Sequence, residues 1–266
     1  MRLLVTGGLG FIGINATSFF AKQNEVCVID NCSRIGVKHN IEKLVSLGVN
    51  YYDINIANYN DLRKVYDVVK PDVIFHLAAQ VAVTLSIQDP KEDFESNLLG
   101  TFNLLEQVRL DDNKPIVLYA STNKVYGQNI DDSSILDGKS DSTDTDGVSE
   151  ECQLSFGTPY GCSKGAADQY VIDYAKTYQI PTITFRQSCI YGPHQYGLED
   201  QGWVAWFGIC ASLDLDLTIY GDGTQIRDVL YIDDLIELYE RAILDIDKIS
   251  GKAFNVGGGP ENTLSL

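Results

Sequence analysis

Short runs of β-branched and aliphatic residues alternate, over the first 186 residues, with segments whose apolar residues recur at helical spacing. The strand-like runs are 3–7, 26–30, 49–53, 72–78, 115–121 and 181–186. The helical patterns cover 12–22, 59–69, 93–109 and 160–178. Strands that alternate with helices in this way form βαβ units, in which a helix crosses from one parallel strand to the next. The pattern therefore predicts an α/β fold, with a doubly wound parallel sheet over residues 1–187.

The rest of the chain predicts a small second lobe. We expect residues 188–227 and 257–266 to form part of that lobe, while residues 228–256 return to the large domain. The segment 128–155 is rich in Asp, Ser, Thr and Gly and has almost no apolar periodicity. It is expected to be a solvated acidic loop, with a lid near the substrate as the alternative.

Charge and cysteine content narrow the classes of function. The 266 residues carry a formal net charge of -17, which disfavours nucleic acid and anionic membrane surfaces as partners. Six cysteines without a CxxC pair and only three histidines give no zinc-type spacing, so no metal is expected. The amino-terminal apolar run is interrupted by glycines and fits a buried strand better than a signal peptide. We expect a cytoplasmic protein with reduced thiols.

The stretch "TGGLGFIG" places Gly7, Gly10 and Gly13 between the first strand and the first helix. Glycines there permit a tight turn, so that a pyrophosphate can approach the helix N-terminus. The second strand ends at Asp30, where a carboxylate can accept hydrogen bonds from the adenine ribose and repel a 2′-phosphate. Arg34 argues the other way, because a guanidinium can pair with that phosphate. The sequence predicts a Rossmann dinucleotide site that favours NAD over NADP.

The stretch "TPYGCSKGAADQY" places Tyr160 and Lys164 four residues apart at the start of a helical pattern. Residues at this spacing share one helix face, so the ammonium is expected to lower the pKa of the phenol. Such a tyrosine could take a proton from a sugar hydroxyl beside a nicotinamide. The alternative is that both side chains merely share an exposed helix surface.

The glycine turn, the run "YASTNKVYG" and the Tyr160–Lys164 pair follow in the order found in the extended short-chain dehydrogenase/reductase family, which the chain resembles over its whole length. The resemblance implies that Thr122 acts with Tyr160 and Lys164. It implies cofactor contacts from Gly7, Gly10, Phe11, Ile12, Gly13, Asp30, Asn31, Ser33, Arg34, Asp53, Ile54, Leu77, Ala78, Ala79, Gln80, Asn97, Tyr160 and Lys164. It implies substrate contacts from Thr122, Asn123, Gln187, Ser188, Gln201, Gly202 and Arg227.

Departures from common family patterns narrow the activity. Sugar-nucleotide 4,6-dehydratases carry Asp-Glu after the catalytic threonine, where this chain has Asn123 and Lys124. Common UDP-hexose 4-epimerases have an asparagine where "RQSCIYG" has Cys189. The blocks "DQGWVAWF" and "GDGTQIRDVLYIDDL" resemble the branch that epimerises CDP-linked 3,6-dideoxyhexoses at C2. The resemblance implies an NAD-dependent epimerase, with a UDP-sugar 4-epimerase or a catalytically silent NAD-binding protein as alternatives.

Several expectations concern the second lobe. The resemblance directs Arg227 toward the nucleotide diphosphate, with an ion pair to Asp228 as the alternative. The aromatic residues Trp203, Trp206 and Phe207 could bound the sugar or base, or pack into a core. The resemblance also implies further chain after "FNVGGGPENTLSL", so we expect an incomplete substrate lobe, and a homo-oligomer as the assembly.

Overall fold

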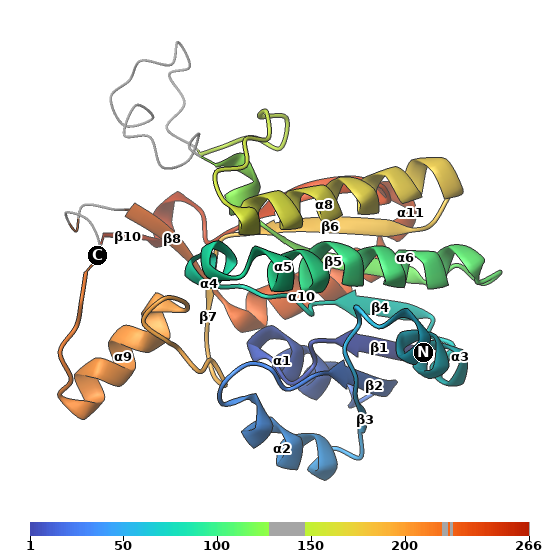
Figure 1. Cartoon of the computed structure of the whole chain (residues 1–266), viewed down its shortest axis with the longest axis horizontal. Helices are drawn as coiled ribbons and strands as arrows, with labels where there is room; N and C mark the ends of the chain where they lie inside the picture. Colours follow the sequence, from blue (N-terminus) through green and yellow to red (C-terminus); the bar gives the residue numbers. More distant parts are fainter. Residues whose placement is uncertain (128–146, 220–222, 224–225, 266) are drawn as a thin grey trace.

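The computed structural model describes residues 1–127, 147–219, 223 and 226–265. Its centre is a seven-stranded sheet in the order β3-β2-β1-β4-β5-β6-β9, in which every neighbouring pair is parallel (Figure 1). The strands are β1 (Arg2–Thr6), β2 (Glu25–Asp30), β3 (Asn50–Asp53), β4 (Val73–His76), β5 (Ile116–Thr122), β6 (Thr182–Gln187) and β9 (Lys252–Val256). The predicted doubly wound parallel sheet is confirmed, and each of the six predicted strands is present.

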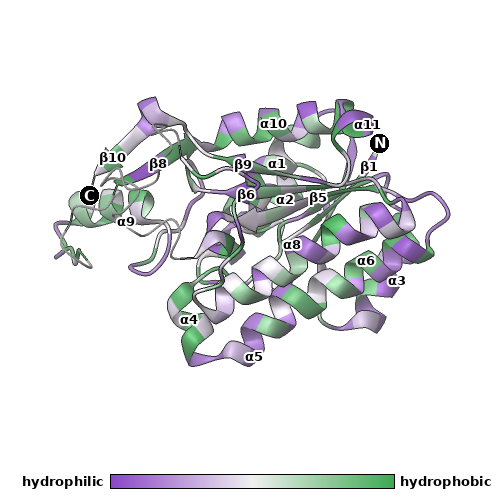
Figure 2. Ribbon diagram, turned by 90° about the horizontal axis from the view of Figure 1, so that it is seen from above, coloured by the Kyte–Doolittle hydropathy of each residue, from purple (hydrophilic) through white to green (hydrophobic). Residues whose placement is uncertain are grey.

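Helices cover both faces of this sheet, as Figure 2 shows. One face carries α1 (Phe11–Phe20), α10 (Ile232–Leu244) and the shorter α2 (Asn40–Ser46) and α11 (Ile246–Ile249). The other carries α3 (Tyr59–Val69), α6 (Gly100–Leu110) and α8 (Pro159–Tyr178). Successive strand residues point to opposite faces, so each strand supplies both layers.

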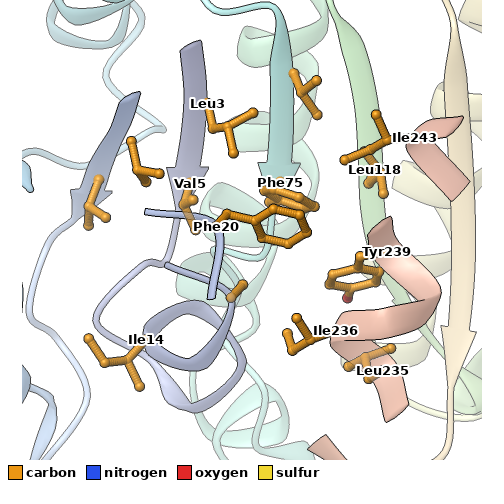
Figure 3. Close-up of a cluster of buried hydrophobic side chains, with 14 of the residues drawn as sticks. Leu3, Val5, Ile14, Phe20, Phe75, Leu118, Leu235, Ile236, Tyr239 and Ile243 are labelled. Carbon is orange, nitrogen blue, oxygen red and sulfur yellow. The ribbon is translucent and has the colours of Figure 1, made fainter. Parts of the chain in front are cut away.

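The two cores show this alternation directly. Leu3 and Val5 of β1 face the layer of α1 and α10, whereas Leu4 faces the opposite layer. In the first layer the Phe75 ring lies between Phe20 and Tyr239, with ring centroids 4.8 and 5.5 Å apart (Figure 3). Each such buried apolar side chain contributes about 1.5–3 kcal/mol relative to exposure. These cores hold the carboxyl ends of the strands in fixed positions.

The predicted helix 93–109 is present, but a π-helical turn interrupts its regular winding. The structure has α5 (Pro90–Asp93), then a π-helical turn (Phe94–Leu99), then α6. A Cβ on Gly100 would lie 2.6 Å from Ile56 Cδ1, so the glycine allows close packing at the start of α6. The wide turn places Asn97 in the interior, 1% exposed, and such π-turns are common at functional sites. A short helix that the periodicity missed, α4 (Val83–Gln88), precedes α5.

A small lobe projects beyond the carboxyl ends of the strands (Figure 1). It comprises α9 (Trp203–Leu213) and a three-stranded sheet of β7 (Cys189–Tyr191), β8 (Ile226–Tyr231) and β10 (Thr263–Ser265). β8 pairs with β7 and β10 rather than with the large sheet. Leu230 of β8 packs against the core of the large domain, and Ile232, the first residue of α10, is buried in it.

The predicted acidic loop 128–155 is described by the structure only at its C-terminal end. Most of the predicted acidic loop, residues 128–146, lies outside the described residues; in its described end, Val148 O and Glu150 Oε1 accept hydrogen bonds from Asn255 at 2.6 and 2.7 Å. Of the helices in the described ranges, none is long and apolar enough to cross a membrane. Within the same ranges, no group of three His, Cys, Asp or Glu side chains is placed to hold a metal ion.

Candidate active site

A cavity of about 640 Å³ opens where the carboxyl ends of the parallel strands meet the small lobe. Parallel sheets bind ligands at this edge. Nearly all of the predicted site residues line this cavity: Gly7, Gly10, Phe11, Ile12, Gly13, Asp30, Asn31, Ser33, Arg34, Ile54, Leu77, Ala78, Ala79, Gln80, Thr122, Asn123, Tyr160, Lys164, Gln187, Ser188, Gln201, Gly202 and Arg227. The structure thus brings both predicted sets, for cofactor and for substrate, to one cavity.

Two predicted cofactor residues do not line the cavity. Asp53 is exposed at the end of β3, in register with Asp30, and its neighbour Ile54 faces the cavity instead. Asn97 lies one layer behind the wall. Its Oδ1 accepts from Gln80 N at 2.8 Å and its Nδ2 donates to Gln80 O at 3.0 Å. Asn97 therefore holds the backbone of a lining residue instead of contacting a ligand itself.

The glycine turn forms a close-fitting cradle. Gly7 has φ +70°, and a Cβ on it would lie 2.7 Å from Ala78 N. A Cβ on Gly13 would lie 2.2 Å from Gly7 O. Gly10 caps α1 without any side-chain hydrogen bond to the first turn. The first amide groups of α1 thus meet the cavity without a capping side chain, which suits an anionic pyrophosphate.

Asp30 is fixed beside this turn. Its Oδ2 accepts from Leu9 N at 3.0 Å and its Oδ1 accepts from Cys32 N at 2.9 Å. Burial raises the pKa of Asp30, and these backbone donors oppose that rise. A carboxylate has about four acceptor positions, so two such bonds leave capacity for ribose hydroxyls.

Arg34 reaches across the cavity from the same end of the sheet. Its guanidinium donates a hydrogen bond to Gln201 Oε1, close to the charge of Asp200. Burial lowers the pKa of Arg34, and Asp200 opposes that effect. Arg34 thus connects the cofactor end of the cavity with the small lobe, a role that the sequence did not suggest.

The start of α8 positions the catalytic candidates. Thr158 caps the helix, its Oγ1 accepting from Gly161 N at 3.1 Å, and Pro159 occupies the first helical position. Tyr160 and Lys164 then face the end of β5, where Thr122 lies. All three side chains line the cavity and are otherwise buried, at 8%, 3% and 7% exposure respectively.

The predicted effect of Lys164 on Tyr160 is not present in this structure. Burial raises the pKa of Tyr160 to about 12, and a hydrogen bond with Thr122 only partly opposes it. Lys164 Nζ instead donates to Ala120 O at 2.5 Å and lies 4.3 Å from the centroid of the Tyr119 ring. Burial lowers the pKa of Lys164 to about 7, against the charges of Asp168 and Asp93.

A buried histidine supports the site from behind. His76 Nδ1 lies 2.7 Å from Thr6 Oγ1, and Nε2 lies 2.8 Å from Thr101 Oγ1. Thr101 donates its own hydroxyl proton to Asn97 O, so its oxygen accepts a hydrogen bond from His76 Nε2–H. Burial lowers the pKa of His76 to about 3. A histidine in an apolar strand was the one sequence signal for this network.

The small lobe closes the cavity from the other side. Trp203 lines the wall, with its Nε1 3.5 Å from Cys189 Sγ, while Trp206 and Phe207 are not among the lining residues. Asp228 accepts hydrogen bonds from Ser188 Oγ and, at 2.9 Å, from Gly258 N. Asp228 thereby fixes the junction between the lobes, and Arg227 beside it faces the cavity.

The sequence did not predict the contacts by which the loop 193–201 ties the small lobe to the large domain. Asn15 Nδ2 donates to Pro193 O at 2.9 Å, Lys43 Nζ lies 2.6 Å from His194 Nε2, and Thr84 Oγ1 donates to Asp200 Oδ2 at 2.8 Å. The loop has no apolar periodicity, so no sequence pattern pointed to these contacts.

A tyrosine and a lysine share a cavity with a glycine cradle at the carboxyl ends of the strands of a Rossmann sheet. This arrangement is typical of a dinucleotide-dependent enzyme that acts on a sugar or an alcohol. The chain belongs to the NAD dependent epimerase/dehydratase family, whose profile matches residues 3–257. This membership confirms the predicted family, the predicted enzyme class and NAD as its cofactor.

Individual relatives extend the comparison. The chain is 45% identical over 281 residues to CDP-paratose 2-epimerase of Salmonella typhi, covering 100% of this chain and 81% of the relative. It is 31% identical to dTDP-glucose 4,6-dehydratase of Escherichia coli, covering 98% of this chain and 73% of the relative. The crystal structure of Thermus thermophilus UDP-glucose 4-epimerase in complex with NAD superimposes with a TM-score of 0.82, at 29% identity, covering 100% of this chain and 79% of that one.

Proposed function

We propose that this protein is an NAD-dependent epimerase that inverts C2 of a CDP-linked 3,6-dideoxyhexose, interconverting CDP-paratose and CDP-tyvelose. The observation that carries the proposal is that Thr122, Tyr160 and Lys164 line the same cavity as the glycine cradle. The choice of sugar is supported by the 45% identity to a CDP-paratose 2-epimerase.

The cavity fits NAD by its shape and its donors. The cradle that a Cβ on Gly7 or Gly13 would fill suits the pyrophosphate, and Asp30 suits the adenine ribose. Leu77, Ala78, Ala79 and Gln80 line the same cavity as Asp30 and Tyr160. Bound NAD would supply a hydride acceptor in the first half of the reaction and a hydride donor in the second.

Inverting C2 requires oxidation, because a carbon without an adjacent carbonyl has a C–H bond too weakly acidic for proton abstraction. Tyr160 takes the proton of the C2 hydroxyl as C2 loses its hydride, and a 2-keto sugar results. Thr122 holds the substrate oxygen by a hydrogen bond. The Lys164 ammonium stabilises the negative charge that develops on Tyr160 and the substrate oxygen during proton transfer. After the keto sugar presents its other face, hydride returns to C2 and Tyr160 gives the proton back.

The residues after Thr122 favour epimerisation over dehydration. Asn123 and Lys124 line the cavity where elimination of water would need a carboxylic acid and a carboxylate. An amide cannot act as a general acid or base near neutral pH, and an ammonium cannot act as a base. The 2-keto sugar therefore returns to a hydroxyl instead of losing water.

The remaining assignments complete the proposal. The large sheet and its helices bind NAD, and the small lobe binds the sugar nucleotide, with Arg227 directed to the diphosphate because a guanidinium forms paired bonds to phosphate oxygens. Gln187, Ser188, Gln201 and Gly202 bound the sugar. The expected homo-oligomer agrees with the exposed aromatic side chains of Phe102 and Tyr170, whose ring centroids lie 5.9 Å apart across α6 and α8.

The test supplies the full chain with CDP-paratose, CDP-tyvelose and UDP-glucose, each deuterated at the carbon to be inverted. We expect a CDP-sugar product that keeps deuterium at C2 with inverted configuration, because the hydride returns to the carbon that it left. Tyr160→Phe is the matched control, which preserves the ring and should lower turnover by about 10²–10⁴-fold. Loss of the label to solvent, or inversion of UDP-glucose at C4 instead, would refute the proposal.

A further inference from the structure

A carboxylate that the reaction does not use lies directly behind the catalytic helix. Asp93, the last residue of α5, is 1% exposed. Its Oδ2 accepts from Ser163 Oγ, and its Oδ1 accepts from Gln80 Nε2 at 3.0 Å and from Asn97 Nδ2 at 3.1 Å. Three side-chain donors therefore converge on one interior carboxyl group.

The orientation of these donors is fixed by the backbone. Gln80 Oε1 accepts from Ala82 N at 2.5 Å, so Gln80 Nε2 must face Asp93. Asn97 Oδ1 accepts from Gln80 N at 2.8 Å, so Asn97 Nδ2 must do the same. Burial raises the pKa of Asp93, and the hydrogen bonds from Ser163 and Gln80 oppose that rise because they stabilise the ionised form. These partners are all neutral, so none of them balances the charge of Asp93.

These contacts join two parts of the active site. Ser163 lies between Tyr160 and Lys164 on α8, and Gln80 lines the cavity. We propose that Asp93 is a positioning residue, which ties the start of α8 to the Gln80 wall and contributes, together with Asp168, the negative charge that holds the Lys164 ammonium beside Tyr160. The functional part of this inference rests on the proposed role of Lys164 in assisting Tyr160.

A second carboxylate, Asp168, acts on Lys164 as well, and it raises the pKa of Lys164 more than Asp93 does. Tyr119 of β5 and Tyr160 of α8 are neutral phenols, and His76 of β4 is a neutral imidazole. Asp168, one turn along α8, is already paired with Arg186 through two hydrogen bonds of 3.0 Å.

Of the two carboxylates that act on Lys164, Asp93 is therefore the one whose hydrogen-bond partners are all uncharged. Burial lowers the pKa of Lys164, while the charges of Asp168 and Asp93 raise it. The Asp93 charge also raises the pKa of Tyr160. Removing the Asp93 charge would thus lower the pKa of Lys164 and the pKa of Tyr160 together, so that Lys164 loses its proton more readily and the Tyr160 phenol ionises more readily. The two effects act on turnover in opposite directions, so the titration of Lys164 itself decides the proposal.

The experiment follows Lys164 by NMR in the full chain labelled with ¹³C at lysine Cε, with the signal assigned from Lys164→Met. Asp93→Asn keeps the shape of the side chain and removes its charge, and we expect the pKa of Lys164 to fall by about one unit. Ser163→Ala is the control, because it removes a hydrogen bond to Asp93 but keeps the charge, and Lys164 should titrate as in the unaltered protein. An unchanged pKa in Asp93→Asn, or an equal fall in Ser163→Ala, would overturn the proposal.

A reciprocal measurement covers the case in which Asp93→Asn does not fold. Coupling between two sites is mutual, so Lys164→Met should raise the pKa of Asp93, followed through its ¹³Cγ signal; no change there refutes the coupling. Neither titration needs a sugar. A chain that shows both shifts but does not turn over CDP-sugars would contradict the proposed function alone, whereas an active chain without them would contradict the role of Asp93 alone.

Discussion

Lys164 Nζ lies 4.3 Å from the centroid of the Tyr119 ring. This contact explains how a lysine with 3% exposure is accommodated, since the ring face and the Ala120 carbonyl together replace part of its hydration. The replacement is incomplete, because the pKa of Lys164 falls to about 7. A residue to which the proposed mechanism gives a role is thus held at a cost in stability.

That cost predicts a pH-dependent effect of Lys164→Met. A folded-state pKa of about 7 lies below the usual value near 10.4, so the unfolded chain binds more protons between these values. The loss of unfolding free energy caused by burying the Lys164 ammonium is complete below pH 7 and vanishes as the pH rises toward 10.4. We expect Lys164→Met to raise the free energy of unfolding at pH 6 by a few kcal/mol, and by much less at pH 10. Urea unfolding of both proteins at the two pH values measures this, and an equal difference at both would contradict it.

Removing the charge of Arg186, which is paired with Asp168 in the interior, should destabilise the protein, whereas removing the charge of Lys164 should stabilise it. Their side chains are 4% and 0% exposed, and Arg186 Nη1 also donates to Tyr126 Oη at 2.9 Å. Arg186→Met would leave an unpaired carboxylate in the interior, so we expect a loss of about 3–5 kcal/mol in unfolding free energy. The control is Arg241→Met, which breaks the surface pair with Glu237 and should cost under about 1 kcal/mol. Comparable losses for both variants in urea unfolding would show that Arg186 is not held as described.

The glycine cradle makes a prediction about cofactor binding. In Gly13→Ala the new methyl group would lie 2.2 Å from Gly7 O, a backbone atom that cannot move without opening the turn. We expect at least a hundredfold weaker NAD affinity by calorimetry, equivalent to about 2.7 kcal/mol. Gly208→Ala in α9 is the control, since no atom lies within 4 Å of its Cβ position. NAD affinity that is preserved in Gly13→Ala would mean that the pyrophosphate lies elsewhere.

The sequence predicted those parts of the molecule that depend on local periodicity. Alternating strands and helices indicated the parallel sheet, and the glycine turn with Asp30 indicated its ligand edge. Periodicity failed at the π-helical turn, because one extra residue per turn changes which side chains face inward and so hides Asn97 in the interior. It also overlooked α10, although Ile232, Leu235, Ile236 and Tyr239 have helical spacing and are buried.

The electrostatics of the site could not be predicted in the same way. The pair of Tyr160 and Lys164 was recognised by spacing, but spacing carries no information about burial, which dominates both pKa values. The contacts of Asp93 with Ser163 join positions 70 residues apart, and only the folded chain brings them together.

The choice between NAD and NADP depends on Asp30 and Arg34, which argued in opposite directions from the sequence. In the structure Asp30 is fixed at the glycine turn, while the Arg34 guanidinium donates to Gln201 of the small lobe. The carboxylate should therefore control discrimination against a 2′-phosphate, and Arg34 should not. We expect Asp30→Ser to narrow the ratio of NAD to NADP affinity by about tenfold or more, since one repulsive contact is worth about 1.4 kcal/mol or more.

Arg34→Ala provides the contrast that completes this prediction. Losing the bond to Gln201 should loosen the small lobe, so the KM for the sugar nucleotide should rise several-fold while the NAD to NADP ratio stays constant. Calorimetric titration of each variant with both cofactors measures the ratio, and steady-state kinetics measure the KM. If Arg34→Ala weakened NADP binding selectively, its guanidinium would reach the ribose when cofactor binds, and the orientation toward Gln201 would not govern cofactor choice.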